Sequence, residues 1–131
     1  MADNPNVPST AKSTEPPPSI EGYGGGVFRV DRVIHTGSLI VMPTGIVAWT
    51  VAEFGKVDET SLPPSMFGDA HIELLLLGCG ERMEMVPRPL RDALRAVGTV
   101  VEPMGTGAAV RTYNVLLGEN RRVAAALIAV D

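Results

Sequence analysis

The sequence predicts an α/β fold whose C-terminal half forms a largely parallel sheet and whose N-terminal half forms an antiparallel β meander. Two observations carry this prediction. From Ile72 to Val130, three apolar strand-like runs alternate with two helix-like segments, an order that favours right-handed crossovers between parallel strands. From Val27 to Ala52, runs rich in β-branched residues are separated by turn sequences short enough for hairpins.

Residues 1–19 are predicted to form a disordered tail. They contain prolines at positions 5, 8, 16, 17 and 18, several serines and threonines, and little apolar bulk apart from Val7. Such a segment cannot bury enough apolar surface to offset the entropy lost on ordering. We therefore expect one α/β domain over residues 20–131.

Three strands are predicted in the meander. They are Val27–Ile34, Ser38–Met42 and Ile46–Val51, with turns at residues 35–37 and 43–45. The preceding stretch, residues 20–26, carries four glycines and is predicted to be an irregular, turn-rich entry. Trp49 is expected to anchor the core or its rim.

The elements of the C-terminal half follow from apolar spacing. A short helical turn is expected from Ser61-Leu62-Pro63 through Met66 or Phe67. The apolar run Ile72–Leu77 predicts a strand covered on both faces. Helices are predicted from Pro87 or Arg88 to a C-terminal cap at Gly98 and from Thr106 to Leu117, and further strands at Thr99–Glu102 and Val123–Val130.

Composition excludes several classes of function. The net charge is −4 and the basic residues are not clustered, so no nucleic-acid partner is expected. Cys79 is the only cysteine, which rules out an intrachain disulfide and a cysteine-based zinc site. The acidic residues are scattered without histidine partners, so neither a metal nor a cofactor is expected. The apolar runs fall short of the about 20 residues that span a bilayer and no signal pattern is present, which predicts a cytoplasmic protein without membrane insertion.

Three stretches carry a resemblance to a known family. They are residues 72–80 (IELLLLGCG), 104–116 (MGTGAAVRTYNVL) and 121–127 (RRVAAAL), joined by residues 37–49 upstream. The chain resembles the family of the mitochondrial complex I assembly factor 3 and the adipogenesis-associated Mth-domain proteins. The resemblance implies a three-layer fold with a mixed central sheet, and a non-catalytic role in binding or assembly. Cys79 stands where the family usually has Thr, and Val110 where it often has Cys, so a family role for a thiol at the second position does not apply here.

Two glycine-rich corners, Gly78-Cys79-Gly80 and Gly105-Thr106-Gly107, follow predicted strands and are expected to meet at one edge of the sheet. The N–H groups of the first corner, with Arg82 beside them, would suit an anion. Alternatively, the glycines only satisfy the backbone of a tight turn. Neither corner has the full Gly-x-Gly-x-x-Gly spacing.

The strongest candidate site is the helix that follows the second corner. Thr106 is expected to cap it, and Gly107, Arg111 and Asn114 fall on one stripe, with Thr112 beside them. Arg111 would hold a carboxylate or phosphate through two parallel hydrogen bonds. Alternatively, Arg111 pairs with Glu81, Glu84 or Glu102, and Asn114 satisfies a neighbouring loop carbonyl.

No catalytic residue is expected. Cys79 needs a base, but His71 begins the same strand roughly 20 Å away and His35 is predicted to lie in a turn, so Cys79 is interpreted as structural. The favoured function is a binding or assembly module that holds a protein partner through the strand-end edge and the arginine face of residues 88–95, as a monomer or weak dimer. The alternative is a small-anion or nucleotide binder, or an enzyme, that uses the two corners with Arg82, Arg111, Thr112 and Asn114.

Overall fold

The computed structural model describes residues 18–67 and 71–131, so the tail predicted over residues 1–19 lies almost entirely outside the described residues. The described part contains two sheets, two α-helices and three short 3₁₀ turns. The strands are β2 (Ile20–Gly24), β3 (Val27–Val30), β4 (Val33–Thr36), β5 (Leu39–Met42), β6 (Gly45–Ala48), β7 (Leu74–Gly78), β8 (Val100–Met104) and β9 (Val123–Leu127). The helices are α1 (Arg88–Ala96) and α2 (Thr106–Gly118), and the 3₁₀ turns are η1 (Phe54–Lys56), η2 (Glu59–Ser61) and η3 (Pro64–Phe67).

The central sheet is mixed. Its order is β6-β5-β9-β7-β8, and β7 pairs in parallel with both β8 and β9. Strand β5 pairs antiparallel with β9, with Leu39 opposite Leu127, and antiparallel with β6. The two parallel pairings come from the C-terminal β-α-β-α-β units, and the two antiparallel pairings add a hairpin from the N-terminal half.

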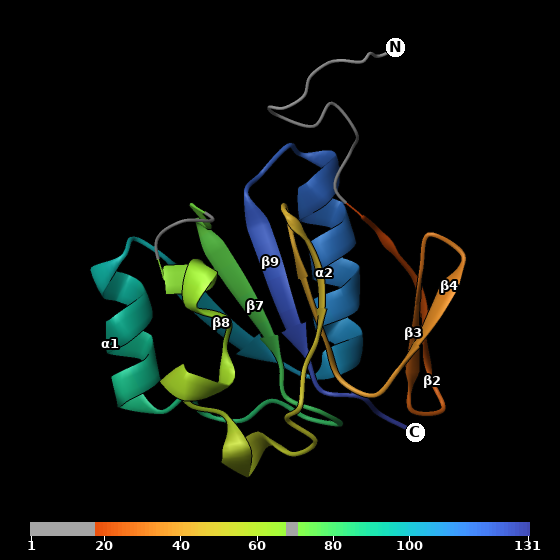
Figure 1. Ribbon diagram of the computed structural model, residues 1–131, viewed down its shortest axis with the longest axis horizontal. Coiled ribbons are helices and arrows are strands. Elements are labelled where there is room, and N and C mark those ends of the chain that lie inside the picture. The colour runs from red at the N-terminus through yellow and green to blue at the C-terminus, as the bar shows by residue number, and fades with distance from the viewer. Residues whose placement is uncertain (1–17, 68–70) are drawn as a thin grey trace.

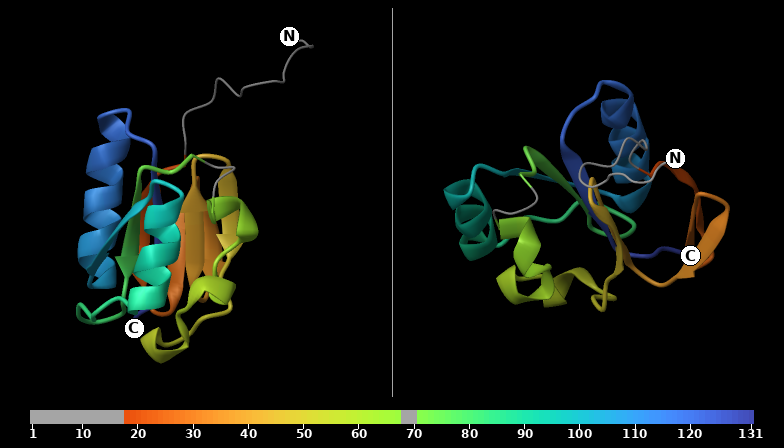
Figure 2. Two further views of the ribbon diagram at one scale, coloured as in Figure 1. Left: turned by 90° about the vertical axis from the view of Figure 1, so that its left-hand side faces the viewer. Right: turned by 45° about the horizontal axis from the view of Figure 1, so that its top comes forward.

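Three layers result from this arrangement (Figure 1). Helix α1 and the 3₁₀ turns lie on one side of the central sheet, whereas α2 and the separate sheet β2-β3-β4 lie on the other (Figures 1 and 2). Because side chains alternate along a strand, Leu75 and Leu77 of β7 join the core under α1 while Leu76 joins the core under α2. Both cores are therefore built on the same strands. The three-layer fold with a mixed sheet is confirmed.

The helices and strands predicted for the C-terminal half are all present, although the last strand, β9, ends at Leu127 and not at Val130. Helix α1 begins at Arg88, buries Leu90 and Leu94, and is followed by Gly98 with a positive φ of 85°. Helix α2 begins at Thr106, as expected, and runs one residue past the predicted end at Leu117. The predicted helical turn after Pro63 is the 3₁₀ turn η3, which ends at Phe67.

Two predictions for the N-terminal half are wrong. Residues 20–26 are not an irregular entry, because Ile20–Gly24 forms β2 and Gly25-Gly26 makes the tight turn into β3 with φ values of 61° and 79°. The predicted strand Val27–Ile34 is broken at Asp31-Arg32, where φ values of 50° and 68° reverse the chain and create β4. The meander therefore divides between two sheets instead of forming one.

Candidate functional site

The two glycine-rich corners meet at the carboxyl ends of the parallel strands. Gly78 is opposite Met104 in the β7–β8 register. The Cys79 N–H donates to the Met104 carbonyl over 2.8 Å, and the Thr106 N–H donates to the Gly80 carbonyl over 2.8 Å. The corners thus contact each other directly and bond each other's backbone.

Thr106 is the centre of this contact. Its side chain is fully buried, and its Oγ1 accepts a hydrogen bond from the Gly80 N–H at 3.0 Å and donates to the Ile128 carbonyl at 2.7 Å. Gly78 lies directly against it, since a Cβ there would sit 3.1 Å from Thr106 Oγ1 and 2.9 Å from Leu127 Cδ2. The prediction that Thr106 caps α2 is wrong: the N-cap is Gly105, and the Thr106 hydroxyl instead ties the ends of β7 and β9 to the start of α2.

Arg111 lies one helical turn beyond Gly107, beside a residue that the sequence did not single out. A Cβ on Gly107 would stand 2.5 Å from the Tyr23 hydroxyl and 3.5 Å from Arg111 Nη1, so Tyr23 and Arg111 both approach the helix where it has no side chain. Neither is buried, and within the described residues Arg111 pairs with none of its expected acidic partners. A glycine one turn before an arginine, with a tyrosine in a glycine-rich strand, is too common a pattern to have identified Tyr23.

Asn114 holds strand β2 against α2. Its Oδ1 accepts from the Ile20 N–H at 3.0 Å and its Nδ2 donates to the Ile20 carbonyl at 2.8 Å, so both ends of the amide have partners within the fold. The buried Tyr113 hydroxyl donates to the Pro18 carbonyl at 2.7 Å, and burial, followed by the charge of Asp31, raises the pKa of Tyr113 far above its ordinary value. Thr112 lies half-buried on the same helix. The alternative in which Asn114 satisfies backbone groups is the one observed.

A pocket of about 310 Å³ opens beside the first corner, and its lining is acidic. Cys79 and Gly80 line it together with four carboxylates, those of Glu53, Glu81, Glu84 and Asp131. Burial raises the pKa of the Cys79 thiol, against smaller opposing contributions from backbone hydrogen bonds, and the thiol donates to the Leu77 carbonyl at 3.4 Å. The thiol is therefore kept protonated and poorly nucleophilic.

The loop between β7 and α1 is the most exposed apolar feature near the corners. Met85 is 85% exposed and Met83 is 57% exposed, and Arg82 beside them is also exposed. Methionine is flexible and polarizable and is over-represented on adaptable protein-binding surfaces. We call residues 82–85 the methionine loop.

Residues 18–67 and 71–131 contain no group of three or more His, Cys, Asp or Glu side chains placed to hold a metal ion. Within the same residues, neither helix combines the length and the hydropathy that crossing a membrane requires.

Two curated relatives have similar sequences. An uncharacterised protein of Rhodobacter capsulatus is 38% identical over 109 residues, which cover 83% of this chain and 82% of the relative. The NADH dehydrogenase [ubiquinone] 1 alpha subcomplex assembly factor 3 of Xenopus tropicalis is 33% identical over 111 residues, which cover 83% of this chain but only 60% of that protein.

Solved structures match the fold closely. A crystal structure described as an outer membrane protein from Bartonella henselae superposes with a TM-score of 0.81 at 37% identity, covering 88% of this chain and 97% of the other. The solution structure of a Mth938-like domain from Bordetella pertussis gives a TM-score of 0.67 at 28% identity, covering 94% and 92%.

The family model described as a protein of unknown function (DUF498/DUF598) matches residues 20–128, which contain both corners, α2 and every strand of the two sheets described above. The similarity to the assembly factors and to the Mth938-like domain agrees with the resemblance found in residues 72–80 and 104–116. This chain belongs to the DUF498/DUF598 family.

Proposed function

We propose that this chain is a non-catalytic binding module of the assembly-factor type, and that it holds a protein partner at the edge where the two corners meet. The observation that carries the proposal is the methionine loop, which places Met83 and Met85 in solvent directly after the first corner. Two large apolar side chains exposed on one loop are stabilised by contact with another apolar surface.

The use of polar groups at the corners supports this proposal over an anion site. The Gly80 N–H, the Thr106 N–H and the Thr106 hydroxyl all bond within the fold, so they are not directed at a ligand. The neighbouring pocket carries the carboxylates of Glu81 and Glu84 and would repel an anion. A partner with basic side chains around an apolar contact would match this edge.

The family adds the assembly role. Several relatives bear the name of a complex I assembly factor, and this chain spans about three-fifths of the length of the Xenopus tropicalis one. By analogy we assign this chain a part in building a multi-protein complex. The cytoplasmic location and the monomeric or weakly dimeric state stay predictions.

Site-specific photo-crosslinking tests the proposal. A photoreactive amino acid is placed at Met83, which is 57% exposed, and in a matched control at Val115 on α2, which is 60% exposed. In cells that carry the native chain, we expect a discrete crosslinked protein from position 83 that is absent from position 115. The same products from both positions, or none from position 83, would contradict a partner at the methionine loop.

One observation favours the anion-binding alternative: the exposed Arg111 lies beside the Tyr23 hydroxyl near the start of α2. Thermal-shift assays with phosphate, nucleotides and carboxylates test it. A bound ligand at a hundredfold excess over its Kd would stabilise the fold by about 2.7 kcal/mol. If no ligand shifts the melting temperature, or if Arg111→Ala leaves the shift unchanged, this alternative is wrong.

A further inference from the structure

We propose that the free edge of β6 and the pocket beside it accept an extended, uncharged peptide segment of a partner protein. The segment would add a strand to the central sheet and place one apolar side chain in the pocket. This surface is separate from the methionine loop, so the inference goes beyond the proposed function and does not depend on it.

The backbone of β6 faces outward at alternate residues. Among residues 18–67 and 71–131, strand β6 is the last strand of the central sheet and pairs only with β5. The turn at residues 43–44 places Met42 opposite Gly45, and the Trp49 N–H continues the ladder to the Ser38 carbonyl at 3.0 Å. Because hydrogen-bonded pairs alternate along an antiparallel ladder, Gly45, Val47 and Trp49 point their backbone groups at β5. Ile46 and Ala48 therefore point theirs away from the sheet, and no other described residue bonds them.

Apart from its short length of four residues, this edge lacks the usual protection against strand addition. Residues 43–52 contain no charged side chain, and Pro43 lies in the turn and not within the strand. Natural proteins normally protect free edges with charges, proline or bulges. The opposite edge of the same sheet, β8, carries Glu102 and Pro103. The contrast between the two edges indicates that β6 is kept open for pairing.

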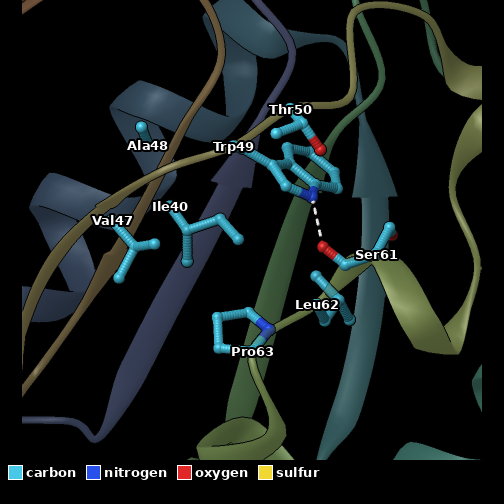
Figure 3. Close-up of a pocket in the computed structure, with 8 residues that line it drawn as sticks. All are labelled: Ile40, Val47, Ala48, Trp49, Thr50, Ser61, Leu62 and Pro63. Atoms are coloured by element: carbon cyan, nitrogen blue, oxygen red, sulfur yellow. Dashed lines mark hydrogen bonds between the residues drawn. The ribbon is translucent and has the colours of Figure 1, made fainter.

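An apolar pocket of about 260 Å³ lies along this edge, on the face of the sheet that α1 covers (Figure 3). Ile40 of β5, Val47 of β6 and Trp49 directly after β6 line it on one side, and residues 61–63 form its far wall. The wall is fixed because the Trp49 Nε1–H donates to the Ser61 carbonyl at 2.7 Å, as the dashed line in Figure 3 shows. None of the lining residues is charged. A strand added beside β6 would direct alternate side chains onto this face, next to Val47, and one of them would enter the pocket.

A second copy of this chain fits the pocket poorly. In an antiparallel pairing of two β6 strands, the partner copy would present Gly45, Val47 or Trp49 on this face. Gly45 has no side chain, Trp49 is buried and already bonded to Ser61, and Val47 is itself part of the pocket lining. The pocket is therefore suited to a larger apolar side chain from a different protein.

Peptide selection on the full chain tests the inference. A phage-displayed library of random linear dodecapeptides is selected on the folded protein, and the enriched peptides are synthesised. We expect uncharged sequences rich in β-branched or aromatic residues. Hydrogen exchange should be fast at the Ile46 and Ala48 amides in the free protein and should slow when a peptide is bound.

Two variants block the surface in different ways. Ala48→Pro removes an outward N–H and keeps the ladder to β5, as edge strands allow, whereas its control Ala48→Val keeps that N–H. Val47→Lys places a charge at the pocket, and its control Val97→Lys changes a residue of the same 39% exposure at the end of α1. We expect binding to weaken about tenfold or more in the blocking variants and to be unchanged in the controls.

Circular dichroism and thermal melts establish that each variant is folded, and Val47→Lys keeps the test decisive should the proline variant unfold. Equal binding by the blocking variants, protection of the methionine loop instead of β6, or failure to enrich any peptide would overturn the inference. A dimer detected by light scattering and abolished by Val47→Lys would also overturn it, because the occupant would then be a second copy. Loss of the crosslink at Met83 would leave this result unaffected.

Discussion

At the scale of single residues, the polar groups of the predicted site divide into two kinds. The side chains of Thr106 and Asn114 form hydrogen bonds within the fold, whereas those of Arg82 and Arg111 are exposed. The first kind holds the corners and β2 in place. The second kind is available to a partner or a ligand.

Replacing Thr106 with valine tests its role as the tie between the corners. Thr106→Val keeps the shape of the side chain but leaves the Gly80 N–H and the Ile128 carbonyl without their partner. We expect a loss of about 1–3 kcal/mol in the free energy of unfolding, measured in urea. Thr112→Val, on the same helix and without a hydrogen bond in the described structure, serves as control and should change stability by less than about 0.5 kcal/mol. Equal losses in the two variants would contradict the role of Thr106.

The buried thiol of Cys79 makes stability depend on pH. Its pKa in the folded state is raised above the ordinary 9.0 by burial, so the folded protein keeps a proton that the unfolded chain releases. The resulting stabilisation is present below pH 9 and is lost as the pH rises through the folded-state pKa. Urea unfolding of wild type and Cys79→Ala between pH 7 and pH 10 should therefore show the stability difference moving against wild type at high pH. A difference that is constant with pH would show that the thiol titrates normally in the fold.

At the scale of elements, local patterns identified each C-terminal helix and strand because their caps and apolar spacing lie within a few residues of one another. Leu90 and Leu94 predict the buried face of α1, and Gly98 predicts its end. The division of the N-terminal strands was missed for the opposite reason. Asp tolerates positive φ but Arg does not usually adopt it, so Asp31-Arg32 lacks the Asn-Gly or Asp-Gly signal of a hairpin turn. The pairing of β5 with β9 joins residues more than 80 positions apart. The meeting of the corners could be predicted because the carboxyl ends of parallel strands lie at one edge of a sheet. The hydrogen bonds made by the polar groups of the corners could not be predicted, because they depend on where β9 ends.

Substitution of Asp31 and Arg32 tests whether the β3–β4 turn is strained. Asp31 and Arg32 both have the left-handed conformation that two-residue hairpins usually assign to Asn-Gly. Replacing Asp31-Arg32 with Asn-Gly should raise the free energy of unfolding by about 0.5–1 kcal/mol, because Gly adopts this conformation without steric cost. The hydrogen bond that the backbone N–H of residue 32 donates to Glu21 Oε1 is kept in this variant. Thermal unfolding measures the change, and a lower melting temperature would mean that the Asp31 and Arg32 side chains contribute more than the strain costs.

At the scale of the whole molecule, the central sheet joins two cores that are separate from each other. The core under α1 contains Trp49, Leu75 and Ala124, and the core under α2 contains Phe28, Leu76 and Ala125. Strands β7 and β9 contribute alternate residues to both, so neither core can lose its packing without exposing a face of the strands that the other needs. The sequence predicted one domain over residues 20–131, and this shared construction gives that prediction a physical basis.

Cooperativity of unfolding tests the single domain. Trp49 is the only tryptophan in the chain and lies in the core under α1, so its fluorescence reports that layer, whereas far-UV circular dichroism reports both layers. Because β7 and β9 belong to both cores, we expect the two signals to give the same midpoint and slope in urea. Phe28→Leu, a change confined to the core under α2, should shift both curves equally, although Trp49 lies on the far side of the sheet. If Phe28→Leu shifted the dichroism curve and left the fluorescence curve in place, the layer formed by α2 and the β2-β3-β4 sheet would unfold independently.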